Sequence, residues 1–320
     1  MVKSKELSDV SVAVLIPCYN EEKTVGLVVE GFQKELPDAT IYVFDNNSID
    51  KTAEVAQDAG AQVVPESRQG KGNVVRSMFR LIDADVYVMV DGDNTYSPRD
   101  AKAMIQPILS DVADMVVGDR LSSKLYEHEN TRKFHNFGNQ LVRSMINKLF
   151  GSDCKDILSG YRVFSRFFVC NFPVMTEGFE IETELTLYTL DKNFRLLELP
   201  INYKDRVEGS ESKLSTFGDG YKILKTIGFV FKNYKPFVFF STASAILAIV
   251  GLLIGYSPVM EYMKFHYVYR VPSAILAASI EILAALLFGC GLILDTIVRQ
   301  EKEQFELRLT DFYKKNNKNK

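Results

Sequence analysis

The chain has 320 residues, of which 47% are hydrophobic and 25% are charged, so it can form one large domain with an appended segment. This composition excludes disordered and collagen-like classes, and a formal net charge of -3 argues against nucleic acid as a partner. Four cysteines without Cys-x-x-Cys spacing and three histidines indicate neither a zinc site nor a disulfide framework.

The N-terminal part of the chain alternates short apolar runs with helical segments. Strands are predicted at Val10–Ile16 and Thr40–Phe44, followed by helices that end near Glu35 and Ala59, with Asn20 as the cap of the first helix. Strands and helices that alternate at this spacing form a parallel, doubly wound sheet. The first ten residues lack the apolar core of a signal peptide, so this part is expected in the cytosol.

A glycine-rich loop follows a short third strand at Gln62–Val64. Its sequence is Arg68-Gln69-Gly70-Lys71-Gly72, in which the glycines allow close backbone approach and the two cations are expected to face outward. Such a loop fits the binding of a phosphate or a sugar nucleotide, with Lys71 as a contact. An ordinary solvated glycine turn has the same pattern, so the loop alone leaves both interpretations open.

Two carboxylates separated by one glycine end the apolar run Val86–Val90. This run predicts a buried strand that delivers Asp91 and Asp93 to the C-terminal edge of the sheet, where open α/β sheets bind ligands. Nearby carboxylates repel each other unless a cation or a proton lies between them. Mg²⁺ or Mn²⁺ is usually held by one or two carboxylates and by substrate phosphates, so a metal-bound diphosphate is predicted. A polar turn that closes the strand is the alternative.

More polar residues follow the later strands. A strand at Asp114–Val117 ends in Gly118-Asp119-Arg120, and the turn Asp156–Arg162 opens into another strand before a last one at Arg195–Ile201. Helices are expected near 99–109, at 131–150 and from 178 onwards. In the last of these, Glu180 is expected to be solvated, whereas Glu184 is either solvated or functional.

The C-terminal third predicts attachment to a membrane. Residues 216–236 form a basic amphipathic segment, and two uncharged runs, Phe237–Tyr256 and Val271–Leu294, are each long enough to span the ~30 Å hydrocarbon core. Their connection, Ser257–Arg270, carries few positive charges, whereas both flanks are basic, which places the soluble domain and both termini in the cytosol. Glu281 is costly in lipid and is expected to face the other helix, another subunit or a headgroup.

These features predict four regions: a soluble α/β domain at 1–215, the amphipathic helix at 216–236, a membrane hairpin at 237–298 and a basic cytosolic tail at 299–320. A soluble site that is tethered in this way suggests one soluble substrate and one lipid substrate. A phosphate on the lipid would explain the basic residues between the site and the membrane, which are Arg120, Arg132, Arg206 and Lys213. A homo-oligomer that packs through the membrane helices is a further possibility.

A series of six ordered motifs resembles family 2 glycosyltransferases, and most closely the polyprenyl-phosphate (dolichol-phosphate type) sugar transferases with C-terminal membrane helices. The motifs are Ile16–Glu22, Asp45–Asp50, Arg68–Gly72, Asp91–Asp93, Gly118–Arg120 and Asp156–Arg162. The resemblance covers residues 10–215. It implies a GT-A fold and inverting transfer of a hexose from a UDP- or GDP-sugar to a polyprenyl phosphate such as undecaprenyl or dolichyl phosphate.

The resemblance also implies roles for single residues. Pro17, Tyr19 and Glu21 match positions that line the nucleotide, and Asp45 matches the carboxylate that contacts the base or ribose. Asp91 and Asp93 match the metal-diphosphate motif. The residues expected to take part in catalysis are Asp93, Arg120, Asp156 and Arg206, and those near the acceptor phosphate include Arg132. Many relatives have a second acid within Asp45-Asn46-Asn47-Ser48, and this departure leaves the base specificity open.

The chemistry of a phosphate acceptor agrees with this interpretation. A lipid phosphate, with a second pKa near ~6, is largely ionised at neutral pH and needs no strong general base. Asp156 is therefore expected to orient rather than to deprotonate. Two rivals remain. A hydroxyl acceptor on another lipid or glycan would need Asp156 or Glu182 as a true base, and a catalytically silent membrane scaffold would not bind nucleotide sugar with metal.

Overall fold

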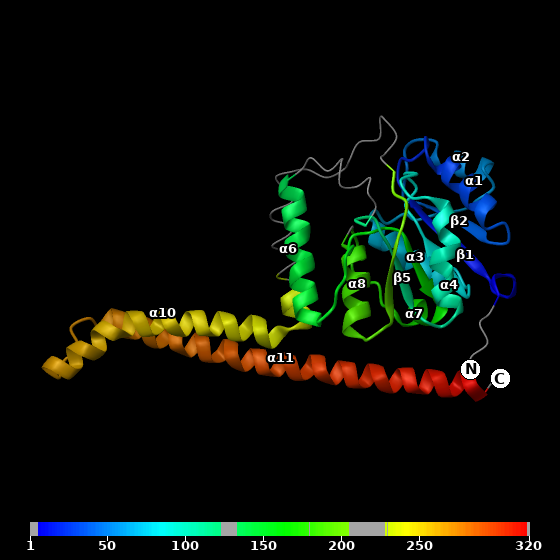
Figure 1. The fold of residues 1–320 in the computed structure, drawn as a ribbon. Helices are drawn as coiled ribbons and strands as arrows, with labels where there is room; N and C mark the ends of the chain where they lie inside the picture. The colour runs from blue at the N-terminus through cyan, green and yellow to red at the C-terminus, as the bar shows by residue number, and fades with distance from the viewer. Residues whose placement is uncertain (1–5, 123–132, 179, 205–227, 229, 319–320) are drawn as a thin grey trace. The chain divides into compact units, whose positions relative to one another are not determined.

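The computed structural model describes residues 6–122, 133–178, 180–204, 228 and 230–318 of the chain. The chain divides into two compact units, Met1–Thr216 and Phe217–Lys320. The first unit is an α/β domain and the second is a pair of long helices (Figure 1). The amphipathic helix predicted at 216–236 lies mostly outside the described residues, of which 228 and 230–234 are helical.

A seven-stranded sheet forms the centre of the first unit, with the strand order β3-β2-β1-β4-β6-β5-β7. The strands are β1 (Val12–Cys18), β2 (Thr40–Asp45), β3 (Gln62–Pro65), β4 (Val86–Met89), β5 (Met115–Asp119), β6 (Arg162–Ser165) and β7 (Leu196–Pro200). The parallel pairing of β1 with β2 and β4, and of β2 with β3, confirms the predicted doubly wound half. Because these strands are parallel, the residues that follow them gather at one edge of the sheet.

Strand β6 runs against this direction. It pairs antiparallel with β4 on one side and with β5 on the other, and β5 then pairs parallel with β7. The sequence predicted a strand here but not its direction, because a run of apolar residues looks the same in a parallel and in an antiparallel strand. The insertion of β6 places the turn 156–161, which leads into it, next to the end of β4.

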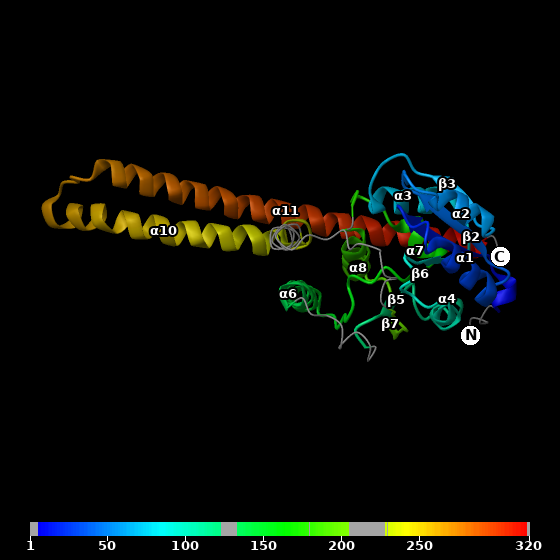
Figure 2. The same cartoon turned by 90° about the horizontal axis from the view of Figure 1, so that it is seen from above.

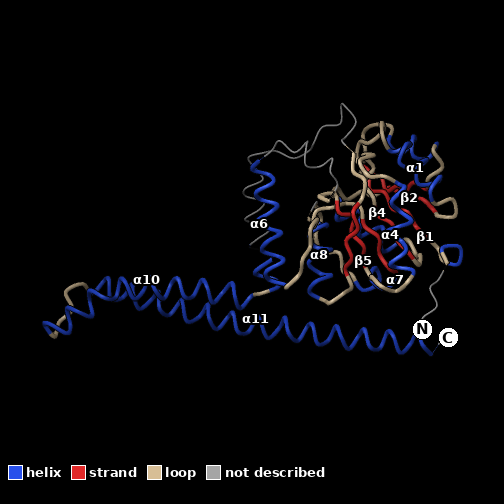
Figure 3. Tube along the Cα trace, viewed as in Figure 1, coloured by secondary structure: helices blue, strands red, loops and turns tan. Residues whose placement is uncertain are grey.

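Helices cover both faces of the sheet, and Figure 3 shows the strands between them. They are α1 (Val25–Glu35), α2 (Thr52–Asp58), α3 (Lys71–Leu81), α4 (Ala101–Leu109), α7 (Arg166–Asn171) and α8 (Ile181–Asp191), with short 3-10 turns at Leu7–Asp9 and Pro98–Asp100, whereas α6 (Lys133–Phe150) stands apart from the sheet and contacts α8. Val14 and Ile16 of β1 share one core with Phe32 of α1 and Met104 of α4. On the other face Phe79 of α3 packs edge-on against β4 and β6.

The first helix begins later than the sequence predicts. α1 starts at Val25, and Asn20 does not cap it, because a turn in which Glu21 accepts from Thr24 and Val25 intervenes. Asn20 instead has a positive φ of 55°, and its side-chain oxygen accepts a hydrogen bond from the Ile49 amide at 2.8 Å. The residue therefore joins the loops that follow β1 and β2.

The second unit is a hairpin of α10 (Pro236–Phe265) and α11 (Val271–Lys318), which run side by side (Figure 2). Both helices are long and apolar enough to cross a membrane, with mean hydropathies of 2.5 and 2.2 over their apolar parts. Only 11% and 17% of those parts are buried by the chain itself, unlike the core helices of soluble domains. The predicted connection at Ser257–Arg270 is shorter in the structure, because α10 continues through Pro258 to Phe265.

Small residues allow the two helices of the hairpin to pack closely. Ser244 donates a hydrogen bond from its hydroxyl to the Ala284 carbonyl at 2.7 Å, and Gly255 packs against Ala277. Glu281 faces α10, as one of the predicted alternatives has it, and its side chain lies against Gly251, where any larger residue would collide with the carboxylate.

Candidate active site

Four predicted acids surround one buried thiol at the C-terminal edge of the sheet. Cys18 ends β1 opposite Asp45 of β2, and its side chain is 2% exposed. Burial raises the pKa of the Cys18 thiol well above its usual value, and four nearby carboxylates raise it further, namely Glu21, Asp45, Asp91 and Asp93. The structure thus brings together acids that lie far apart in the sequence.

Asp45 presents a carboxylate oxygen that the described residues leave unsatisfied. Its Oδ1 atom is buried without a hydrogen-bond partner among them, while Oδ2 accepts from the Ser48 amide at 3.4 Å. A buried acceptor without a donor costs free energy of about 1–3 kcal/mol. The geometry therefore favours a ligand that donates a hydrogen bond here, such as a base or a ribose hydroxyl.

The glycine-rich loop is held by the residue after Asp45. The Asn46 amide group donates to the Glu66 and Arg68 carbonyls at 3.0 and 2.8 Å, and its oxygen accepts from the Gly70 amide at 2.7 Å. The prediction that both cations face outward is wrong for Lys71, and it holds only in part for Arg68. Arg68 is half-exposed, but its guanidinium grips Glu66 at 2.9 and 3.0 Å.

Glu66 gives this loop a pH dependence. Hydrogen bonds from Arg68 and Ser77 lower the pKa of the buried Glu66 carboxyl from 4.5 to about 2. A carboxyl group whose pKa is lowered by folding stabilises the fold at pH values above its ordinary pKa. This stabilisation is lost as the pH falls from about 4.5 to about 2. At pH 7, Glu66→Gln is therefore expected to lower the free energy of unfolding by about 2 kcal/mol.

Thermal unfolding of the full chain in detergent between pH 7 and pH 3 measures this effect. The difference between wild type and Glu66→Gln should shrink as the solution becomes more acidic. Glu54→Gln, at an exposed position of α2, is the matched control and should unfold like the wild type. A constant difference at every pH would contradict the role assigned to the Glu66 charge.

Lys71 points into the site. Its Nζ lies 2.5 Å from Asp91 Oδ1 and 2.5 Å from Glu182 Oε1, and its side chain is 10% exposed. Burial alone would lower the pKa of Lys71, but Asp91 and Glu182 outweigh it and hold the pKa above its usual value. The lysine that sequence predicts as a nucleotide-sugar contact is thus the cation next to the predicted metal carboxylate.

Asp91 and Asp93 differ in their surroundings. Asp91 is partly exposed and lies against Gly160, where a side chain would collide with Asp91 Oδ2. Asp93 is buried, and its Oδ1 accepts from the Thr95 amide at 3.2 Å and the Thr95 hydroxyl at 2.6 Å. Asp91 is therefore the more accessible of the two carboxylates.

A divalent cation fits this donor set. No group of three or more histidine, cysteine or acidic side chains that could hold a metal occurs among the described residues. Mg²⁺ and Mn²⁺ do not require one, because substrate phosphates supply the other ligands. The ammonium of Lys71 on Asp91 Oδ1 shows that the carboxylate attracts a cation. Asp91 and Asp93 would hold the metal.

Arg120 and Asp156 form a second charged pair. The guanidinium donates to Asp156 at 2.7 Å from Nε and 2.8 Å from Nη2, and the Arg120 amide adds a third bond at 3.1 Å. Both carboxylate oxygens are engaged, and the Asp156 side chain is only 3% exposed. Glu198 holds the turn from below by accepting from the Lys155 and Asp156 amides. Asp156 is thus anchored by an arginine rather than poised as a free base.

Tyr96 connects the two charged groups. Its hydroxyl accepts from the Gly160 amide at 2.9 Å, and its ring packs against Tyr203, over which Arg120 lies at 5.6 Å. Burial raises the pKa of Tyr96, a shift that Arg120 opposes and the charges of Asp91 and Asp156 increase. One buried side chain is therefore within electrostatic reach of both carboxylates.

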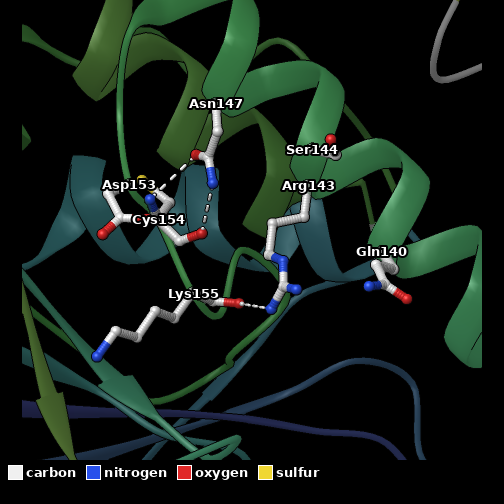
Figure 4. Close-up of a pocket in the computed structure, with 7 residues that line it drawn as sticks. All are labelled: Gln140, Arg143, Ser144, Asn147, Asp153, Cys154 and Lys155. Atoms are coloured by element: carbon white, nitrogen blue, oxygen red, sulfur yellow. Dashed lines mark hydrogen bonds between the residues drawn. The ribbon is translucent and has the colours of Figure 1, made fainter.

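Helix α6 is tied to the turn that precedes Asp156 (Figure 4). Asn147 exchanges hydrogen bonds with the backbone of Cys154 at 2.9 and 3.0 Å, and Arg143 donates to the Lys155 carbonyl at 3.3 Å. These residues border a cleft of about 410 Å³. These contacts fix the end of α6 against the turn that carries Asp156.

Other predicted residues have varied surroundings. Pro17 lies in β1 opposite Phe44, and Tyr19 is half-buried in the loop after that strand. The predicted residues Arg132, Arg206 and Lys213 lie outside the described residues. Glu180, which directly precedes α8, is exposed as expected, whereas Glu184 within α8 is buried and holds the segment 175–176 through the amides of Met175 and Thr176.

The chain is similar to known proteins along most of its length. The profile described as "Glycosyl transferase family 2" matches residues 13–171. Glycosyltransferase AglJ of Haloferax volcanii is 32% identical over 302 residues, which cover 92% of this chain and 96% of the relative. The chain belongs to glycosyltransferase family 2. The dolichyl-phosphate hexose transferase of the same organism is 28% identical over 215 residues, 67% of this chain and 91% of the relative.

Solved structures place the glycosyltransferase in the GT-A fold. One is glucosyl-3-phosphoglycerate synthase from Mycobacterium tuberculosis, in complex with Mn²⁺, uridine diphosphate and phosphoglyceric acid. Its TM-score is 0.58 at 19% identity, and the match covers 70% of this chain and 78% of that chain. At this identity the likeness demonstrates a common fold.

The enzyme also contains site residues that sequence reasoning missed. Asn46 could have been found, since it directly follows a strand and Asp45. Glu66 lies two residues before its partner Arg68, so this pair could have been found, whereas Glu198 holds a turn that is distant in the sequence and carries no local signal. Glu182 was considered only as a base for a rival reaction, whereas the structure pairs it with Lys71.

Proposed function

We propose that this glycosyltransferase transfers a hexose, with inversion, from a UDP- or GDP-sugar to a polyprenyl phosphate at the membrane surface. The observation that carries the proposal is the buried Arg120–Asp156 pair, which lies in one site with Asp91, since Gly160 lies against Asp91 and donates to Tyr96, whose ring packs on Tyr203 beneath Arg120. Arg120 would bind an anionic acceptor, and Asp91 would hold the cation that binds a diphosphate. The two residues thus lie in one site. The relative named dolichyl-phosphate hexose transferase supports the same acceptor class.

On the donor side, Asp45 would accept from the base or ribose with its unsatisfied Oδ1, beside Pro17, Tyr19 and Glu21. Lys71 would contact the diphosphate. A divalent cation held by Asp91 and Asp93 would neutralise the charge that develops on the leaving nucleoside diphosphate. The mycobacterial synthase of the same fold, in complex with Mn²⁺ and uridine diphosphate, supports both of these choices of ligand.

On the acceptor side, Arg120 would orient the lipid phosphate together with Arg132, Arg206 and Lys213. An oxygen of the phosphate attacks the anomeric carbon, a new C–O bond forms, and the bond to the diphosphate breaks with its electron pair on the leaving group. No proton has to be removed from a phosphate that is already ionised. Both oxygens of Asp156 are bound by Arg120, so Asp156 would position that arginine. A hydroxyl acceptor would instead require a carboxylate that is free to act as a base.

Two membrane-spanning helices would keep the domain close to its lipid substrate. The flanks of the hairpin are basic, and the connection at 266–270 carries one basic side chain besides His266, so the catalytic domain and both termini would face the cytosol. The reaction would take place where the phosphate of the polyprenyl lipid meets the aqueous phase.

The test is product formation from radiolabelled UDP- and GDP-sugars by the purified full chain, with Mg²⁺ or Mn²⁺ and in parallel with a chelator. We expect a metal-dependent, lipid-soluble product from polyprenyl phosphate and none from polyprenol, which lacks the phosphate. Transfer to polyprenol would contradict the acceptor class. In sealed vesicles, activity should require nucleotide sugar on the cytosolic side.

A further inference from the structure

Three charged side chains contact one another beside the proposed metal site. The Lys71 ammonium lies 2.5 Å from an oxygen of Asp91 and 2.5 Å from an oxygen of Glu182, and the side chains of Lys71 and Glu182 are 10% and 7% exposed. Two carboxylates and one ammonium leave a net charge of -1. Because the ammonium already lies on Asp91 Oδ1, a metal ion that approaches this oxygen is repelled by a like charge and finds the carboxylate partly neutralised.

The backbone around Lys71 is fixed, so that only its side chain can move. Gly70 has a positive φ of 124° and packs on the Glu177 carbonyl, and the Gly72 amide donates to that carbonyl at 3.0 Å. Any side chain at either glycine would collide with this backbone. Lys71 can therefore leave Asp91 only by turning its own flexible side chain.

We propose that Lys71 is an exchangeable cation, which occupies Asp91 until the metal-diphosphate displaces it, and that Glu182 is the positioning residue that holds Lys71 before and after the exchange. The inference rests on the proposed function, because the diphosphate supplies the new anionic partner for the ammonium. Metal alone offers the displaced ammonium no new anion, so Lys71 would lose one of its two carboxylate partners. Metal and nucleotide therefore bind together far better than either binds alone.

The experiment measures Mn²⁺ binding to the full chain in detergent by electron paramagnetic resonance, without nucleotide and with UDP or GDP, whichever the wild type binds more tightly. For Lys71→Gln we expect Mn²⁺ alone to bind at least about tenfold more tightly, ~1.4 kcal/mol. With the nucleotide present, the same variant should bind Mn²⁺ more weakly than the wild type, since a phosphate contact is lost.

Glu182→Gln is the second variant, in case Lys71→Gln does not fold. It should weaken Mn²⁺ binding both alone and with nucleotide, because Lys71 then has Asp91 as its remaining carboxylate partner and leaves it less readily. Glu180→Gln, two residues away and exposed, is the matched control and should bind Mn²⁺ like the wild type.

Three outcomes would overturn the exchange. A Lys71→Gln shift of equal size and sign with and without nucleotide would indicate a general field effect. An unchanged Mn²⁺ affinity in folded Glu182→Gln would remove the positioning role. If the wild type bound no nucleoside diphosphate with Mn²⁺, the donor side of the proposed function would fall as well, whereas the first two results leave that function intact.

Discussion

Replacing Asp91 by asparagine is expected to lower turnover by at least about 1000-fold. Asp91 is the more accessible acid of the Asp91-Gly92-Asp93 motif, and it holds a cation against its Oδ1 atom. The amide keeps the shape of the side chain but removes the charge that would bind metal and diphosphate. A packing defect is not expected, because the planar group still fits against Gly160.

The measurement is the initial rate of transfer at saturating donor and acceptor, with nucleotide binding followed separately by calorimetry. Both turnover and metal-dependent nucleotide binding should fall in Asp91→Asn. Asp58→Asn, on the exposed face of α2, provides the matched control and should retain wild-type rates. Turnover within about tenfold of the wild type would show that Asp91 does not bind the metal-diphosphate.

Arg120 and Asp156 are expected to act as one unit in catalysis. Arg120→Lys and Asp156→Asn should each lower kcat/KM for the acceptor by about 100-fold, and the double variant should lose little more than either alone. Lysine cannot reproduce the two parallel bonds that the guanidinium makes to the carboxylate at 2.7 and 2.8 Å. Without that anchor, the cation that meets the acceptor phosphate is displaced.

A double-mutant cycle of acceptor kinetics, with donor affinity measured in parallel, checks this coupling. Donor affinity should change little in all three variants. Losses that multiply to about 10⁴ would mean that the two residues act independently. Near-normal turnover of Asp156→Asn would exclude both a base role and the positioning role. If the rate rose with pH in the wild type but not in Asp156→Asn, that result would favour a base role.

The positions of the charged residues explain why part of the site was predictable. Asp45, Asp91 and Arg120 each follow an apolar run, and parallel strands bring such residues to one edge, so their neighbourhood could be inferred from pattern alone. The hairpin was predictable for a similar reason, because length and apolarity decide whether a helix can span a bilayer.

The partners of these residues could not be inferred in the same way. Lys71 belongs to a loop that looks solvated, yet it points inward because Gly70 and Gly72 let the loop pack against the backbone of residues 176–178. Asp156 reaches Arg120 because β6 enters the sheet antiparallel between β4 and β5. Both contacts join segments that are distant in the sequence.

The sequence by itself thus determined the α/β class, the family, the order of the motifs and the two apolar spans, all of which depend on local composition and spacing. The tertiary structure alone decided that Lys71 sits on Asp91 with Glu182 behind it, and that Arg120 binds both oxygens of Asp156. The physical reason is burial. An ionised side chain that leaves water must find an opposite charge, and only the packed chain decides which one is within reach.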